Sequence, residues 1–144
     1  MTSKINFFSE GINYILRDKI AIRKWLMDAA LNEGCKIGEV NIIFCSDACL
    51  SEHNKRYLKH TSLTDIITFD NSEGNVLSGD IFISIERVCE NAIKYKVSKN
   101  QELQRVMIHG ILHLCGYKDK TASERKKMRE KEDEYLLTIT LPTS

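Results

Sequence analysis

The most informative stretch of the chain is residues 98–119, which read SKNQELQRVMIHGILHLCGYKD. Ser98 followed three residues later by Gln101 matches a capping box, so we expect a helix to begin here. Gly116 is suited to end that helix, because glycine adopts the left-handed backbone of a helix C-cap without strain. One face of the helix carries an apolar core stripe, formed by Leu103, Val106, Met107, Gly110, Ile111 and Leu114.

Two histidines lie beside this stripe and predict a metal site. His109 and His113 are four residues apart, so both imidazoles project from the same side of the helix, at the lip of a cleft. A sharp turn at Gly116 can bring Asp119 back toward them. Two imidazoles and one carboxylate leave a position open, which is the ligand set of a catalytic zinc ion. The alternative is two unrelated surface histidines and a solvated Asp119, whereas a closed structural site is disfavoured because Cys115 faces away from the histidines.

The same spacing excludes one class of metalloenzyme. Metzincin proteases share the order His, His, Gly and a third ligand, but they need a glutamate directly after the first histidine as general base. Gly110 occupies that position here and has no side chain to move a proton. A peptidase with these ligands would lack its water-activating group.

The remaining patterns predict a single α+β domain spanning residues 1–144. Alternating or β-branched runs predict strands at 5–8, 40–45, 66–69 and 81–85. Apolar periodicity and capping residues predict helices at 18–33, 86–95 and 121–137, and another that Ser46 or Asp47 caps and that ends near residue 58. We expect a small mixed four-stranded sheet covered by helices, with the metal-site helix arranged as in zincins.

Composition adds mainly exclusions. The chain has 144 residues, 42% of them hydrophobic and 28% charged, which excludes a disordered, fibrous or coiled-coil protein. No apolar run approaches the roughly 20 residues that cross a bilayer, and the N-terminus is too polar for a signal peptide. The five cysteines form no Cys-x-x-Cys pair, so we expect reduced, mostly buried thiols in a cytoplasmic protein.

Three ordered motifs resemble those of the YbeY family of bacterial metal-dependent endoribonucleases. The family's His-Gly-x-Leu-His-Leu-x-Gly-Tyr-Asp-His motif is matched from His109 to Tyr117. Asn54, Tyr57 and residues 63–69 are similar to its second segment, and residues 79–84 to its third. The resemblance implies a single-strand-specific endoribonuclease that acts in 16S rRNA 3'-end maturation and ribosome quality control. It also implies one Zn²⁺, or another divalent transition metal, and the small ribosomal subunit as partner, with no DNA or membrane involved.

Two departures from the family motif affect the site. The family's third ligand is histidine, and the ungapped register puts Asp119 there; an alternative alignment puts Lys120 there, but a protonated amine cannot ligate a metal. In the family's second segment an arginine follows the tyrosine that Tyr57 matches, and Leu58 occupies that position here. Lys59 comes next, and we expect it to bind substrate phosphate as a point charge. The alternative for Lys59 is a solvated surface lysine. Asp65 and Asp80 are interpreted as turn-capping residues at strand starts, with a direct catalytic role for either as the alternative, and no general base is identified.

Charge distribution is compatible with RNA. The formal net charge is only +1, but residues 86–131 contain 12 Lys and Arg against 6 Asp and Glu. Seven lysines could ring the cleft or simply form a solvated surface: Lys94, Lys96, Lys99, Lys118, Lys120, Lys126 and Lys127. Three alternatives stay open: a non-catalytic ribosome-assembly factor with a structural or vestigial metal site, a metallohydrolase of another substrate, and, ranked last, an iron oxygenase with a two-histidine, one-carboxylate triad.

Overall fold

The computed structural model describes residues 3–55 and 65–139, which form an α+β fold. The elements in chain order are β1 (Lys4–Glu10), α1 (Lys19–Asn32), β2 (Lys36–Cys45), α2 (Asp47–His53), β3 (Ile66–Asp70), β4 (Val76–Ser84), α3 (Ile85–Tyr95), α4 (Lys99–Leu114) and α5 (Ala122–Leu136). The strands make one mixed sheet in the order β1-β2-β4-β3. β1, β2 and β4 are parallel, and β3 pairs antiparallel with β4. The predicted fold class is thereby confirmed.

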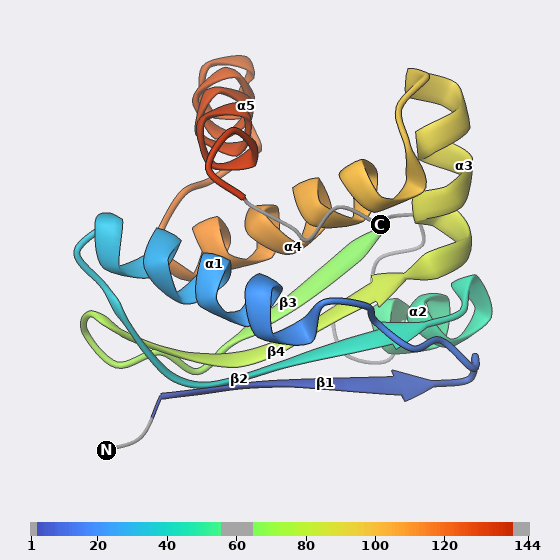
Figure 1. Ribbon diagram of the computed structural model, residues 1–144, viewed down its shortest axis with the longest axis horizontal. Coiled ribbons are helices and arrows are strands. Elements are labelled where there is room, and N and C mark those ends of the chain that lie inside the picture. Colours follow the sequence, from blue (N-terminus) through green and yellow to red (C-terminus); the bar gives the residue numbers. More distant parts are fainter. Residues whose placement is uncertain (1–2, 56–64, 140–144) are drawn as a thin grey trace.

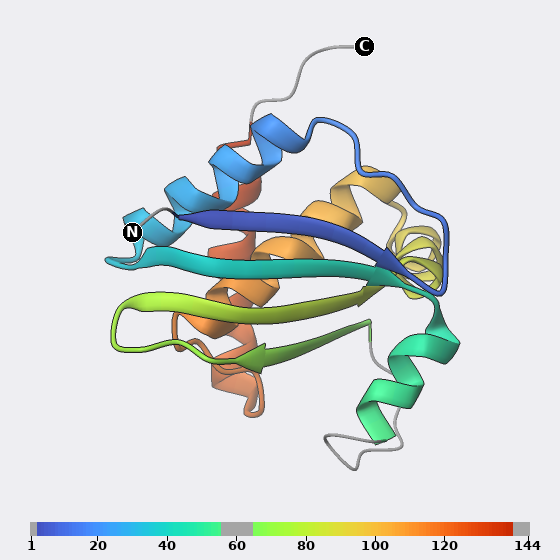
Figure 2. The ribbon, with the colours of Figure 1, turned by 90° about the horizontal axis from the view of Figure 1, so that it is seen from below.

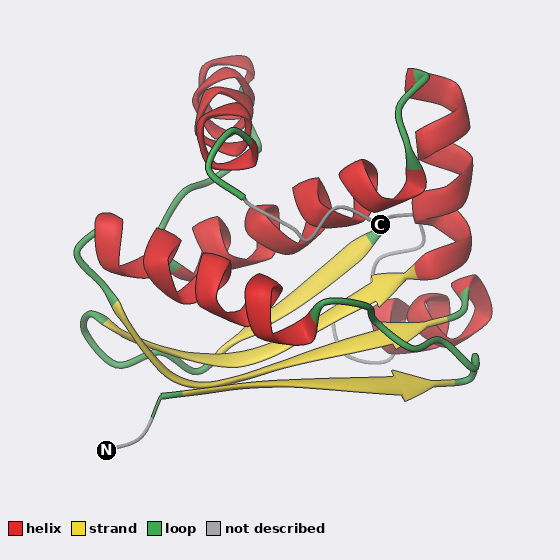
Figure 3. Ribbon diagram, viewed as in Figure 1, coloured by secondary structure: helices red, strands yellow, loops and turns green. Residues whose placement is uncertain are grey.

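Most of the helices gather on one face of the sheet. Figures 1 and 3 show α1 and α4 lying above the strands, with α5 beyond α4. Seen from below, the strands lie in front of α1, α4 and α5, so these three helices share one side (Figure 2). α2 lies instead where β1 and β2 end, and packs on the other face through a small cluster of Cys45, Leu50 and Ile67.

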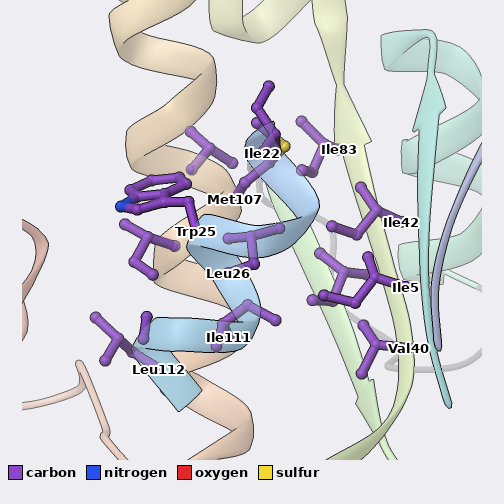
Figure 4. Close-up of a cluster of buried hydrophobic side chains, with 14 of the residues drawn as sticks. Ile5, Ile22, Trp25, Leu26, Val40, Ile42, Ile83, Met107, Ile111 and Leu112 are labelled. Carbon is purple, nitrogen blue, oxygen red and sulfur yellow. The ribbon is translucent and has the colours of Figure 1, made fainter. Parts of the chain in front are cut away.

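The main core fills the space between the sheet and the pair α1 and α4. The stripe predicted on α4 is buried throughout, and Ile108 and Leu112 are buried with it. Figure 4 shows part of this core, with Ile22, Trp25, Leu26, Met107 and Ile111 on the helix side and Ile5, Val40, Ile42 and Ile83 on the sheet side. α4 is therefore fixed against the sheet along its length, which makes it a rigid base for a site.

Gly110 allows α4 to approach the sheet closely. A β-carbon at this position would lie 2.9 Å from Cδ1 of Ile81 and 3.2 Å from Cδ1 of Ile66. The position that carries the general base in metzincins is therefore inside the helix–sheet interface of this protein. The close packing of α4 on the sheet requires a residue without a side chain at this position. A peptidase would require a glutamate there.

The helix caps agree with the sequence in part. Thr121 and Glu124 form the complete capping box predicted for α5, with both reciprocal hydrogen bonds. Ser98 is the N-cap of α4, and its hydroxyl accepts from the backbone N–H of Gln101 at 3.0 Å. The reciprocal hydrogen bond from the Gln101 side chain, which the predicted capping box requires, is not formed. Ser46 caps α2 by accepting from the N–H of Cys49.

Several boundaries differ from the prediction. β2 begins at Lys36 rather than at residue 40. β4 begins at Val76 rather than at residue 81, and the strand continues through Gly79 without a break. Ile85, expected as the end of that strand, opens α3 instead, since Ser84 serves as its N-cap. The C-terminal part of the helix predicted to end near residue 58 lies outside the described residues.

The thiols and the helices bear on two further expectations. All five cysteines are free, but only Cys45 is buried and the other four are half-buried, so the prediction of mostly buried thiols was wrong. None of the described helices has the length and apolar character needed to cross a membrane.

Candidate metal centre

The two histidines of α4 meet at the edge of the packed core. Their ring centroids are 4.6 Å apart, and their side chains are 18% and 28% exposed for His109 and His113 respectively. The helix holds their backbone rigidly because the adjoining stripe is buried. Both rings are thus supported by packing on one side and open to a ligand on the other.

The end of α4 carries the third group back to them. Gly116 has φ of +108°, and its N–H bonds the carbonyl of His113 while the N–H of Tyr117 bonds that of Leu112. This pair of bonds is a Schellman motif, which reverses the chain after a helix. The Tyr117 hydroxyl anchors the turn by donating to Glu33 at 2.7 Å. Asp119 is thereby returned to the histidines.

The three groups converge on one point. Oδ2 of Asp119 lies 3.3 Å from Nε2 of His109 and 3.3 Å from Nε2 of His113, and the three ligand atoms all lie within 4.8 Å of one another. In a tetrahedral zinc site with metal–ligand distances near 2.0 Å, nitrogen and oxygen ligands are also about 3.3 Å apart. The donor types and their spacing therefore fit a divalent transition metal.

Glu132 completes the support of this group, and the sequence analysis missed it. Its Oε2 lies 2.6 Å from Nδ1 of His109, and its side chain is only 6% exposed. Arg105 donates to the other carboxylate oxygen at 2.9 Å. A hydrogen bond from Nδ1–H to Glu132 leaves the Nε2 lone pair directed at the site, which is how outer carboxylates orient metal-binding histidines. The available signal was the spacing of Met128, Glu132 and Tyr135, which puts the glutamate on the buried stripe of α5.

We expect the Glu132→Gln variant to bind Zn²⁺ about 10–100-fold more weakly than the parent chain, the usual cost of removing such a partner. The amide keeps the volume but removes the negative charge that Arg105 and His109 share. Competition with a chromophoric chelator measures the affinity. Asp133→Asn is the matched control, since Asp133 also accepts from Arg105 but is 58% exposed. Equal losses in the two variants would contradict the orienting role.

The pKa of His109 gives a pH dependence to metal binding. Burial disfavours the imidazolium, but the hydrogen bond and charge of Glu132, with the charges of Asp119 and Asp65, outweigh burial and raise the pKa. A proton must leave the imidazole before the metal binds. Zinc affinity is therefore expected to fall about tenfold per pH unit as pH drops through this raised value, beginning above the ordinary histidine pKa of about 6.5. Affinity titrations from pH 5 to 9 test this, and in Glu132→Gln the decline moves to lower pH.

A polar cavity of about 200 Å³ adjoins His109 and Glu132. Burial raises the pKa values of two carboxyl groups in its wall, Asp65 and Glu102. Arg105 and Arg129 also line it, so its cations are arginines of α4 and α5 rather than lysines of the predicted ring. Lys99, a member of that ring, instead lies over the Tyr14 ring, 5.4 Å from its centroid.

The other predicted residues fall in different places. Asp65 lines the same cavity as His109 and therefore lies nearer to the metal centre than its interpretation as a turn-capping residue implied. Asp80 accepts from Asn41 at 3.0 Å, and strand alternation puts it on the face opposite Ile81, which contacts α4. Asp80 is therefore remote from the histidines. Lys59 lies outside the described residues.

Comparison with known proteins identifies the family of the chain. The sequence profile of the family described as Endoribonuclease YbeY matches residues 10–140. The chain belongs to the YbeY family. Proteins named Endoribonuclease YbeY are 52% identical over 130 residues in Cytophaga hutchinsonii and 50% identical over 131 in Christiangramia forsetii. These matches cover 90% and 91% of this chain, and 91% of each relative.

A solved structure extends the YbeY comparison to the fold. The solution structure of a Thermotoga maritima protein superposes with a TM-score of 0.67 at 28% sequence identity, covering 94% of this chain and 89% of that one. The resemblance inferred from the motifs is confirmed, and the chain is placed among endoribonucleases, which hydrolyse RNA. Asp119, which the ungapped register puts at the position of the YbeY motif's third histidine, lies beside the two imidazoles.

Proposed function

We propose that this chain is a zinc-dependent, single-strand-specific endoribonuclease that acts in 16S rRNA 3'-end maturation and ribosome quality control. The observation that carries the proposal is the convergence of His109, His113 and Asp119 within 4.8 Å of one another in a YbeY chain. When bound, the ion supplies Lewis acidity that polarises a phosphoryl oxygen and makes water a stronger nucleophile near neutral pH. The enzyme would work in the cytoplasm on the small ribosomal subunit.

The residues around the metal centre divide the remaining tasks. Glu132 holds the proton at Nδ1 of His109 and so keeps Nε2 available to the metal. Arg129, with a side chain 56% exposed, offers a cation to an RNA phosphate at the mouth of the cavity. The raised pKa of Asp65 suits a group that exchanges a proton during hydrolysis. Lys59 is assigned a phosphate contact on the sequence alone.

The test uses the full chain stripped of metal with a chelator and then supplied with Zn²⁺, Mn²⁺ or Mg²⁺. We expect Zn²⁺ to restore cleavage of a single-stranded RNA, while a duplex of the same sequence and casein both stay intact. Cleavage of casein would favour a metallohydrolase of another substrate. Binding to ribosomal subunits with no RNA turnover at any metal would favour the non-catalytic assembly factor.

A cellular experiment tests the rRNA assignment separately. In cells whose own copy carries His113→Ala, we expect 16S rRNA precursors with extended 3' ends to accumulate. Normal 3' ends, with active enzyme in the purified assay, would leave the endoribonuclease activity standing and overturn the 16S substrate.

A further inference from the structure

A second group of metal-ligating side chains lies at the end of the sheet where β1 finishes and α2 begins. Glu10 ends β1 and pairs in register with Cys45 of β2. The chain continues through Ser46, the N-cap of α2, so the first turn of that helix lies beside the end of β1 (Figures 1 and 2). The side chains of Cys49 and His53 are four residues apart on α2 and therefore on one side of it.

Cys49 and His53 both contact the same carboxylate oxygen of Glu10. Oε1 of Glu10 lies 3.0 Å from the sulfur of Cys49 and 2.9 Å from Nε2 of His53, and the three ligand atoms all lie within 4.8 Å of one another. The imidazole ring of His53 also packs against Phe82, with centroids 4.4 Å apart, which fixes its orientation. The Glu10 and His53 side chains are 49% and 21% exposed, so an ion can reach them from solvent.

We propose that Glu10, Cys49 and His53 form a second metal site that binds Zn²⁺ and fastens α2 to the end of β1. One thiolate, one imidazole and one carboxylate are a donor set for zinc and other borderline or soft cations, and they disfavour Mg²⁺ and Ca²⁺. Tetrahedral zinc holds such ligands about 3.3–3.6 Å apart. The present separations from Glu10 therefore need to widen by about half an ångström, which small side-chain rotations supply.

The second site differs from the first in position, chemistry and consequence. It joins residues that are 39 and 43 positions apart in the chain. It lies on the side of the sheet where α2 packs, whereas His109 and His113 belong to α4. It contains sulfur, and the group of His109, His113 and Asp119 does not. The two sites can therefore be observed separately, and neither proposal depends on the other.

The experiment titrates the metal-free full chain with Co²⁺ alone and records the absorption spectrum and the binding stoichiometry. We expect two equivalents to bind, with a thiolate-to-cobalt charge-transfer band that arises from Cys49. Cys49→Ser loses the band and one equivalent, whereas His113→Ala loses one equivalent and keeps the band. Cys89→Ser is the matched control for a half-buried cysteine elsewhere and keeps both.

A conservative variant, Glu10→Gln, tests the site even if Cys49→Ser fails to fold. Glu10→Gln keeps an acceptor for Cys49 and His53 but removes the charge, so we expect Co²⁺ affinity at the thiolate site to fall by about tenfold or more. A chain that binds one equivalent without the band would overturn the second site. A band that survives in Cys49→Ser, or an affinity unchanged in Glu10→Gln, would overturn it as well. Zinc-dependent RNA cleavage that persists in the absence of the band would leave the proposed function intact.

Discussion

The His113→Ala variant is expected to lose the zinc equivalent of this site and RNA cleavage together while remaining folded. His113 supplies one of three ligand atoms, and its side chain is 28% exposed beside the core rather than within it. Loss of a partner outside the ligand shell already costs about 10–100-fold in metal affinity, so loss of a ligand is expected to cost more than a hundredfold. Metal analysis after dialysis, circular dichroism and cleavage of a single-stranded RNA measure the three properties on one sample.

The control for this variant is Lys118→Ala, an exposed residue in the same turn. It leaves His109, His113 and Asp119 unchanged and is expected to retain full metal content. His109→Ala and Asp119→Ala should repeat the loss seen with His113→Ala, in stoichiometry as well as in activity. Unchanged zinc content at this site in all three variants would end the assignment of these residues as ligands.

The second large effect concerns stability, at Gly79 in the middle of β4. Its φ is +154°, and a β-carbon there would lie 2.1 Å from the carbonyl oxygen of Phe69 on β3. Gly79→Ala must therefore push β3 and β4 apart where Asp70 pairs with Gly79. We expect the free energy of unfolding to fall by about 3–5 kcal/mol, from the backbone clash and the local strain together. Urea denaturation followed by circular dichroism gives this number.

Gly74→Ala is the matched control for Gly79→Ala. Gly74 also has a positive φ, +59°, but a β-carbon there would meet nothing within 4 Å. The left-handed backbone alone costs alanine about 1–2 kcal/mol. A difference between the two variants isolates the clash with Phe69. Equal destabilisation would show that β3 moves aside at no cost and would contradict the close approach.

Local sequence patterns were sufficient to predict the main helices and most of their caps. The stripe on α4, the apolar positions of α1 and the capping residues Ser98, Thr121 and Ser46 are short-range features, and each has the predicted role in the structure except that Ser98 caps alone. The spacing of His109 and His113 also fixes their common side, because helix geometry relates residues four apart. Gly110 was identified as incompatible with a peptidase from its chemistry alone.

Strand limits were less well determined by pattern. β4 continues through Gly79, although glycine ordinarily marks a break in a strand. Glycine is needed here because the backbone of β3 approaches too closely for any side chain. Whether a glycine ends a strand or permits a close approach depends on the neighbouring strand. That information is not in the local sequence.

Sequence patterns alone identified the family, the helix that carries the two histidines and the candidate third ligand at Asp119. The three-dimensional packing was needed to place the acidic groups: Glu132 lies beside His109 and Asp65 in the cavity wall, whereas Asp80 lies on the opposite face of the sheet, away from the metal centre. It also brought Glu10 to Cys49 and His53. Helix periodicity relates residues within about two turns, whereas contacts between groups more than 20 positions apart are set by how the helices and strands pack.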